Sequence, residues 1–241
     1  QPFNQFGISP RLSDWLTLHA GYFSHPISDF TFGDLRVLGG GIDFHPGNIH
    51  LSAAYGIIRH ERTEQKRDSV LVFPGEYKRL MMSAKLGYDH KNGNYIFLNM
   101  MKSWDDTASG NGLTQISPID NMVASVNTGF SVIHGLTIKG EGAISATNAN
   151  RSASRLENGF QLPFNIFTPT ISSFIDGAAK LSIHYNPQSF WSIKTDAQWV
   201  GPGFVTQGFM QLPNDVFDIT VSPTMQLFEK TVSVRGSIGI R

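Results

Sequence analysis

The amino-acid sequence predicts an all-β protein, an up-and-down antiparallel transmembrane β-barrel, and three features carry this prediction. Apolar and polar residues alternate with a period of two through eleven segments. These segments are roughly 9 to 13 residues long, close to the about 9–11 residues of a membrane-spanning strand and longer than the about 5–6 residues usual in soluble proteins. Short and long connections alternate between the segments, as they do in outer-membrane barrels.

Each predicted strand has one apolar and one polar face. Residues 80–88 are typical, because every second residue from Leu80 to Tyr88 is apolar. Residues 96–100 are less regular, since Phe97 and Met101 are apolar on the opposite face. The apolar stripes of the eleven predicted strands run through residues 16–22, 38–44, 49–57, 80–88, 96–100, 124–132, 136–144, 179–185, 191–199, 217–227 and 232–240.

The connections distinguish a barrel from a soluble β-sandwich, which is the alternative that alternation alone leaves open. Tight links rich in Pro, Gly, Asn and Asp occupy residues 45–48, 89–94, 134–135, 186–188 and 229–230. Long links occupy residues 24–34, 59–76, 105–121, 148–173 and 201–214. A sandwich has no reason to alternate so regularly, whereas an up-and-down barrel does.

Aromatic residues gather near the ends of the apolar stripes, where a membrane interface favours them. They are Tyr22, Phe44, Tyr55, Tyr88, Tyr185, Trp191, Trp199, Phe217 and Phe228.

Residues 1–241 are expected to form a single domain. With the long links outside the cell, residues 2–8 add a twelfth strand, and both ends of the chain then lie on the external side. Bacterial barrels usually have an even number of strands and periplasmic ends. We therefore expect these 11–12 strands to be an interior section of a longer chain with 14 or more strands.

Composition excludes several classes of protein. Lys and Arg number 19, as do Asp and Glu, so the chain lacks the basic excess of a nucleic-acid-binding protein. It contains no cysteine, which excludes disulfides and thiolate zinc sites. The charged fraction of 16% is below the about 25% of soluble domains. No run of about 20 apolar residues is present to form a transmembrane helix.

The run QPFNQFGISPRLSDWLTLHAGY (residues 1–22) resembles a family of outer-membrane β-barrel proteins of Bacteroidetes. GGGIDFHPGNIHLSAAYG, ISPIDN, and WVGPGFVTQG followed by LPND are similar to that family in the same order. The resemblance implies a bacterial outer-membrane location and further strands before and after this section. It brings no catalytic residues with it, and Phe23 stands where the family often has a basic residue.

Strand parity predicts that the charged side chains in the barrel interior nearly balance in sign. The expected interior charges are Arg36, Asp43, Arg79, Lys85, Lys139, Glu141, Asp176, Lys180, Lys194, Asp196, Asp218 and Arg235. The neighbours Lys139/Glu141, Asp176/Lys180 and Lys194/Asp196 are expected to pair. A strongly selective pore would show one sign in excess, so the sequence favours a satisfied polar interior.

Histidines raise the question of a metal site. His19, His45, His50 and His184 face inward by parity. Neither an H-E-x-x-H motif nor a paired-carboxylate spacing accompanies them, so we predict no metal, no cofactor and no catalytic residue.

One loop combines the residue types of a hydrolase. Ser24, His25, Ser28 and Asp29 lie together between the first two long strands, and acyl hydrolysis needs a Ser, a His and an acid. An outer-membrane lipid hydrolase is therefore a remote alternative.

The link 148–173 begins polar and then becomes apolar. Its apolar residues are Phe160, Leu162, Phe164, Ile166 and Phe167. An exposed apolar stretch of this kind is expected either to plug the barrel, to dock a partner or to pack on itself.

Together these features predict a non-enzymatic outer-membrane barrel that is a structural or assembly partner in a cell-envelope complex. Its expected partners are the lipid bilayer, outer-membrane lipids and other envelope proteins, and not nucleic acid. A porin-like channel for small solutes is the alternative.

Overall fold

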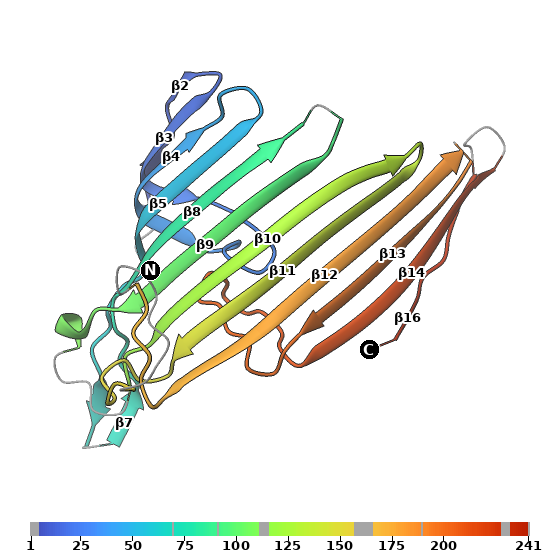
Figure 1. The fold of residues 1–241 in the computed structure, drawn as a ribbon. Coiled ribbons are helices and arrows are strands. Elements are labelled where there is room, and N and C mark those ends of the chain that lie inside the picture. The colour runs from blue at the N-terminus through green and yellow to red at the C-terminus, as the bar shows by residue number, and fades with distance from the viewer. Residues whose placement is uncertain are drawn as a thin grey trace.

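The computed structural model describes residues 5–68, 70–90, 92–110, 116–156, 166–188, 190–227 and 232–240, and its fold is all-β (Figure 1). Fourteen strands of the described chain form one antiparallel sheet. They are β1 (Gly7–Ile8), β2 (Arg11–Ser13), β3 (Leu16–Ser24), β4 (Arg36–Phe44), β5 (Ile49–Arg59), β8 (Arg79–Asp89), β9 (Tyr95–Asp105), β10 (Asp120–Ile133), β11 (Leu136–Asn148), β12 (Ser173–Gln188), β13 (Trp191–Val200), β14 (Val216–Leu227), β15 (Val232–Arg235) and β16 (Ile238–Ile240).

The long strands follow one another in chain order across the sheet, so the up-and-down topology is confirmed. All eleven predicted strands are present. A prolyl residue lacks the N–H that would continue a strand ladder. Pro10 lies between β1 and β2, which both pair with β3, and Pro223 lies opposite the break between β15 and β16, which both pair with β14. The pair β15 and β16 replaces one predicted continuous strand, whereas β1 covers the end of the predicted strand 2–8 and β2 lies where a link was predicted.

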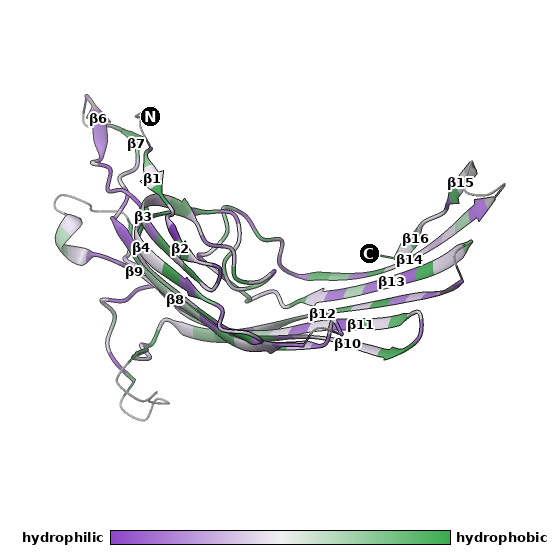
Figure 2. Cartoon of the chain, turned by 90° about the horizontal axis from the view of Figure 1, so that it is seen from above, coloured by the Kyte–Doolittle hydropathy of each residue, from purple (hydrophilic) through white to green (hydrophobic). Residues whose placement is uncertain are grey.

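The sheet is not closed into a barrel. β1 and β2 lie at one edge, β15 and β16 lie at the other, and these edges do not pair with each other in the described chain. Figure 2 shows the sheet bent into a trough whose edges stand apart. The prediction of a closed barrel is therefore not met in this structure, which has a long and strongly curved antiparallel sheet instead.

The predicted alternation of connections is confirmed, which gives the sheet two different ends. Gly47, Gly93 and Gly135 have positive φ angles of 68°, 79° and 79°, the left-handed conformation that tight turns require. These turns mark the turn end. The opposite, loop end carries segments 25–35, 60–78, 106–119, 149–172 and 201–215. They include the hairpin of β6 (Gln65–Arg67) and β7 (Val70–Phe73) and the 3₁₀ turn η1 (Thr107–Ser109).

The two faces of the sheet differ in character. The convex face carries large exposed apolar side chains, such as Leu98 at 53% and Ile144 at 62% exposure. The concave face carries most of the polar strand residues, together with the buried core. In Figure 2 two loops lie inside the trough, over the concave face.

Candidate functional site

Two loops that are far apart in the sequence meet over the concave face. Segments 25–35, between β3 and β4, and 201–215, between β13 and β14, are here called the inner loops. The amide of Gly33 donates to the carbonyl of Gly208 (3.1 Å). Thr206 Oγ1 donates to the carbonyl of Thr31 (2.8 Å). The inner loops therefore join the two sides of the trough through one backbone–backbone hydrogen bond and one threonine hydroxyl.

An apolar row on the concave face supports the inner loops. Five of its side chains are fully buried, one each from β4, β8, β9, β10 and β13: Val37, Met81, Met101, Val123 and Val200. Ile27, Phe30, Phe32 and Phe204 of the inner loops pack against this row in a single core cluster. Burying several large apolar side chains in this way contributes about 1.5–3 kcal/mol for each of them.

Polar side chains of the sheet bind the backbone of the second inner loop. Asn121 Nδ2 donates to the carbonyl of Val205 (2.9 Å), and Asn121 Oδ1 accepts from the amide of Gln207 (3.2 Å). Asp176 Oδ2 accepts from the amide of Gly203 (2.7 Å). Because buried loop backbone needs hydrogen-bond partners, these side chains allow the loop to lie inside the trough.

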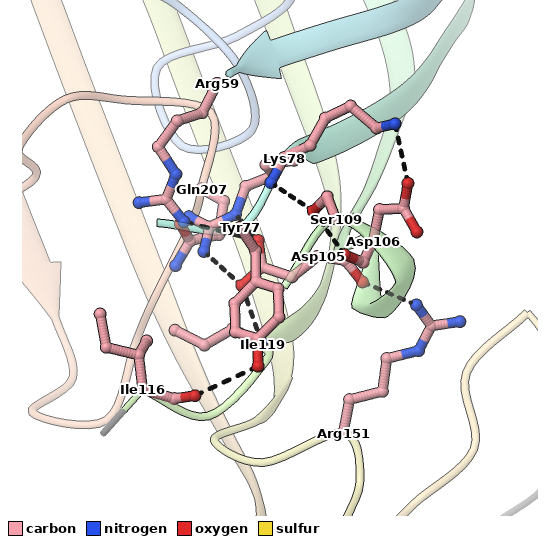
Figure 3. A network of polar contacts seen from close by, with 11 residues as sticks. Arg59, Tyr77, Lys78, Asp105, Asp106, Ser109, Ile116, Ile119, Arg151 and Gln207 are labelled. Atoms are coloured by element: carbon pink, nitrogen blue, oxygen red, sulfur yellow. Dashed lines mark hydrogen bonds and ion pairs between the residues drawn. The ribbon is translucent and has the colours of Figure 1, made fainter. Parts of the chain in front are cut away.

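Asp105, at the loop end of β9, is the centre of a buried ionic network (Figure 3). Its carboxylate accepts from Arg79 Nε (2.7 Å) and from the amide of Ile119 (2.9 Å), and it also contacts Arg59 (3.4 Å). Arg79 in turn donates to Gln207 of the second inner loop. The network therefore fastens β5, β8, β9 and an inner loop to one carboxylate.

A partly exposed ion pair flanks this network. Lys78 Nζ lies 2.8 Å from Asp106 Oδ2. The hydrogen bond from Lys78, with a second one from the amide of Ala108, holds the pKa of Asp106 below its ordinary value. The same bond raises the pKa of Lys78. Both groups are therefore ionised around neutral pH.

Lysines and carboxylates line a cavity of about 390 Å³ between the first inner loop and the turn-end half of the sheet. The charged side chains in its wall are Asp29, Lys139, Glu141, Lys180, Lys194 and Asp196. The three lysines and three carboxylates balance, so the cavity has no net preference for either sign of charge.

The predicted pairings inside this cavity are confirmed only in part. Lys194 pairs with Asp196 (2.9 Å) as expected. Lys180 pairs with Asp29 of the inner loop and not with Asp176, whose carboxylate is occupied by the amide of Gly203. Glu141 accepts from the amide of Asp29 (3.2 Å) and forms no ion pair with Lys139 within 4 Å. The partners of Lys180, Asp176 and Glu141 belong to the inner loops, whose positions cannot be predicted from strand parity.

The register contradicts the prediction for Arg36. Arg36 has the same parity as Leu38, whose partners Tyr22 and Ile57 belong to the convex face, and its side chain is exposed. The remaining predicted charges have concave-face parity. Lys85 reaches the carbonyl of Ile27 (3.4 Å), while on the last strands Asp218 is half-buried and Arg235 is exposed.

A group of histidines lines a smaller cavity of about 270 Å³ near β3, β4 and β5. His25, the first residue of an inner loop, is buried and lies 3.8 Å from Asp43 Oδ1. Burial lowers the pKa of His25, and this effect outweighs the attraction of Asp43. His45 and His50 contact each other, with ring centroids 4.4 Å apart. Among the described residues, no three His, Asp or Glu side chains are arranged to hold a metal ion.

A Ser–His–Asp relay that sequence reasoning missed lies on the same strands. Ser9 Oγ is 2.8 Å from His19 Nδ1, and His19 Nε2 is 2.8 Å from Asp43 Oδ2. These residues come from three separate segments, so only the parity of His19 and Asp43 hinted at their proximity. Chemically, such a relay fixes the tautomer of the histidine and gives it a route to accept the serine proton.

The loop residues that suggested a hydrolase diverge in the structure. Ser28 Oγ lies 3.3 Å from Ser125 Oγ and accepts from the amide of Thr31. Asp29 contacts Lys180, and His25 faces Asp43. Ser24, His25, Ser28 and Asp29 therefore do not form a catalytic group.

The apolar link 149–172 does not plug the concave face with its described residues. Phe167 is buried against the convex face, where Lys102 Nζ lies 4.9 Å from its ring centroid. Ile166 lines the same pocket. Phe160, Leu162 and Phe164 lie outside the described residues. The segments that cover the concave face are instead the inner loops.

Comparison with known proteins adds no relative. No family model matches the chain, and the searches of curated proteins and of solved structures find no significant match. The described part of the chain also has no helix with the length and apolar character needed to cross a bilayer.

Proposed function

We propose that this chain is a wall section of an outer-membrane β-barrel whose interior is filled by its own loops. Its function is then structural: it is an assembly partner in a cell-envelope complex. The apolar convex face is the observation that carries this proposal. In water this face would expose many large aliphatic side chains side by side, far beyond the patches usual for soluble proteins. In a bilayer the same face meets lipid.

Aromatic side chains at both ends of the convex face support a membrane location. Trp15 packs edge-on against Phe44 (5.3 Å), and Tyr185 against Trp191 (5.6 Å), at the turn end. Tyr55 and Trp104 (6.3 Å) lie toward the loop end. Two such belts on either side of an aliphatic band are typical of membrane-spanning barrels. The Bacteroidetes family that the sequence resembles has the same location.

The inner loops favour a structural role over a porin-like channel. They meet each other through backbone hydrogen bonds and bury aromatic side chains against the sheet. A conducting pore needs a continuous water-filled path, and a lumen closed by packed loops does not provide one.

The β6–β7 hairpin is the surface that best fits a protein partner. It projects beyond the loop end of the sheet (Figure 2), and Val72 and Phe73 are 49% and 53% exposed. Apolar side chains on a projecting hairpin edge favour contact with another protein.

Membrane insertion is tested with the tryptophans of the convex face. The full chain, with Trp199 as its only tryptophan, is reconstituted into vesicles whose acyl chains carry bromine. Because Trp199 is 45% exposed on the apolar face, its fluorescence should be quenched by bromine at mid-chain positions. A second variant carries its only tryptophan at Asn127, on the concave face, and should be protected. Equal quenching of both variants contradicts the proposal.

The partner is tested with the hairpin. Val72→Asp with Phe73→Asp should abolish co-purification of envelope proteins that the wild type retains in fixed ratio. Arg62→Ala, at the base of the same hairpin, is the matched control and should retain them. A wild-type barrel that purifies alone contradicts an assembly role.

A second candidate function is hydrolysis, favoured by the Ser9–His19–Asp43 relay. It predicts that a fluorophosphonate probe labels Ser9 and that Ser9→Ala or His19→Ala removes the labelling. Unlabelled wild type, in folded and reconstituted form, eliminates this candidate.

A further inference from the structure

A polar pocket lies on the convex face, where the rest of the surface is apolar. It has a volume of about 340 Å³, within the about 300–1,000 Å³ typical of ligand sites. β8, β9, β10 and β11 form its floor at the loop end of the sheet, and residues 151–155 and 166–170, between β11 and β12, cover it. Its lining includes Lys102, Trp104, Asp120, Arg151 and Arg155.

The floor of the pocket is an ion pair on the face that the proposed function assigns to lipid. Lys102 Nζ pairs with Asp120, and both side chains are buried. Lys102 shares its parity with Leu98, which is exposed on the convex face. An ion pair that faces hydrocarbon carries a large desolvation cost. Such a pair is therefore expected where a loop covers it and where it has a function. Phe167 lies over Lys102 and completes the cover.

The rim of the pocket adds two arginines. Arg151 Nη1 donates to the carbonyl of Asp105 (3.0 Å), which fixes the position of its guanidinium. Arg155 is held through its backbone, which bridges to Thr170. Neither arginine forms a salt bridge with a carboxylate of the described chain. Among the described residues that line the pocket, three cations and one carboxylate therefore leave an excess of two positive charges.

The level of the pocket decides which anion it meets. Trp104 lines the pocket and contacts Tyr55 in the aromatic group near the loop end, the position of a membrane interface in the proposed function. Lipid headgroups lie at this level. Basic pockets at the interface bind phosphorylated headgroups, and guanidinium groups bind phosphate through paired hydrogen bonds.

We propose that this pocket binds the phosphate of a lipid headgroup in the leaflet at the loop end, with Arg151 and Arg155 contacting the phosphate above the Lys102–Asp120 pair. The lipid then covers the aliphatic band below the pocket with its acyl chains. This inference rests on the proposed membrane location.

Native mass spectrometry of the full chain in mild detergent tests the inference. The probes are a phosphorylated glycolipid, the same glycolipid without phosphate, and inorganic phosphate. The wild type should retain the phosphorylated lipid over the dephosphorylated one. Each arginine removed, by Arg151→Ala or Arg155→Ala, should weaken this binding about fivefold, the contribution of one basic side chain beside anionic lipid. Arg62→Ala, which removes a cation at the same end of the sheet, should leave it unchanged.

Three results overturn the inference. They are equal retention of both lipids, equal binding by Arg155→Ala and wild type, and displacement of the lipid by millimolar inorganic phosphate, which would indicate a site for free phosphate. Arg155 has no side-chain hydrogen bond within the described chain, so Arg155→Ala is expected to fold even if Arg151→Ala does not. Bromine quenching of Trp199 is measured in parallel, on the single-tryptophan chain in brominated vesicles described above. Quenching without headgroup preference refutes only this inference, whereas loss of quenching refutes the proposed function.

Discussion

Two buried asparagines on neighbouring strands anchor loops on opposite faces of the sheet. Asn121 of β10 binds the backbone of Val205 and Gln207 over the concave face. Asn148 of β11, paired in register with Asp120, donates to the carbonyl of Thr168 (3.0 Å) over the convex face. An asparagine at nearly the same level of the sheet can therefore bind a loop over the concave face or over the convex face. The loop itself determines which face it covers.

The composition of each loop explains the difference. The inner loops bring buried apolar side chains too, but they also carry hydroxyl groups that bond inside the trough. Thr31 Oγ1 lies 2.9 Å from Ser125 Oγ of the sheet, and Thr206 Oγ1 donates to the carbonyl of Thr31. The segment between β11 and β12 brings Ile166 and Phe167 to the face that is already apolar. Apolar content alone therefore does not make a plug, because the interior of a barrel must also satisfy loop backbone.

Removing the centre of the ionic network should have the largest effect on the concave side. Asp105→Ala leaves Arg79 buried without its partner, and breaking a buried pair costs about 3–5 kcal/mol. The measurement is the urea unfolding midpoint in detergent. The matched control is Asp106→Ala, one residue later on the surface, whose loss should be small because exposed pairs contribute little. Equal midpoints for the two variants contradict this account of Asp105.

Separating the inner loops should have the next largest effect. A Cβ at Gly208 would clash with the carbonyl of Thr31 and lie 2.8 Å from Phe32 Cα. Gly208→Val should therefore destabilise the chain by about 1–3 kcal/mol through overpacking and raise ion conductance in planar bilayers. Gly142→Val is the control, because no atom lies within 4 Å of its Cβ position. Unchanged conductance in Gly208→Val would show that these loops do not close the lumen.

Substitutions of Asn121 and Asn148 test whether the loops on the two faces are anchored separately. Asn121→Ala and Asn148→Ala should each cost about 1–3 kcal/mol, since each leaves buried backbone groups without partners. Limited proteolysis with mass mapping should then separate them. Asn121→Ala should expose cleavage sites in 201–215, and Asn148→Ala should expose sites in 149–172. Cleavage of the same segment in both variants would show that the two loops are not independently anchored.

Much of the sheet follows from periodicity. The eleven strands predicted from the repeat are present because a two-residue repeat leaves a strand only one choice of face once one side is apolar. Closure does not follow in the same way, because pairing between the first and last strands is set by the whole chain. Arg36 was predicted on the wrong face. Its parity matches that of Leu38, on the convex face, and only its charge suggested the concave face.

The inner loops had a signal in the sequence that was not used. Met101 interrupts the pattern of its strand, and Met81, Val123 and Val200 are likewise apolar at polar parity near the loop end. These irregularities form the row on which the inner loops pack. The Ser9–His19–Asp43 relay and the arginine pocket had no comparable signal, because their members meet only through sheet register and loop path.

The smallest expected effect concerns pH and the first inner loop. Burial lowers the pKa of His25 from its ordinary value of 6.5, with Asp43 opposing this shift and His19 and Lys85 supporting it. The folded chain therefore favours the neutral imidazole, whereas the unfolded chain takes up a proton at the ordinary value. The stability that depends on neutral His25 is complete above pH 6.5 and declines as the pH falls below it.

The thermal midpoint of the wild type should fall more between pH 7.5 and 5.5 than that of His25→Gln, which does not titrate. If the two midpoints fall in parallel, the carboxylates of the trough, and not His25, set the acid sensitivity of the inner loop.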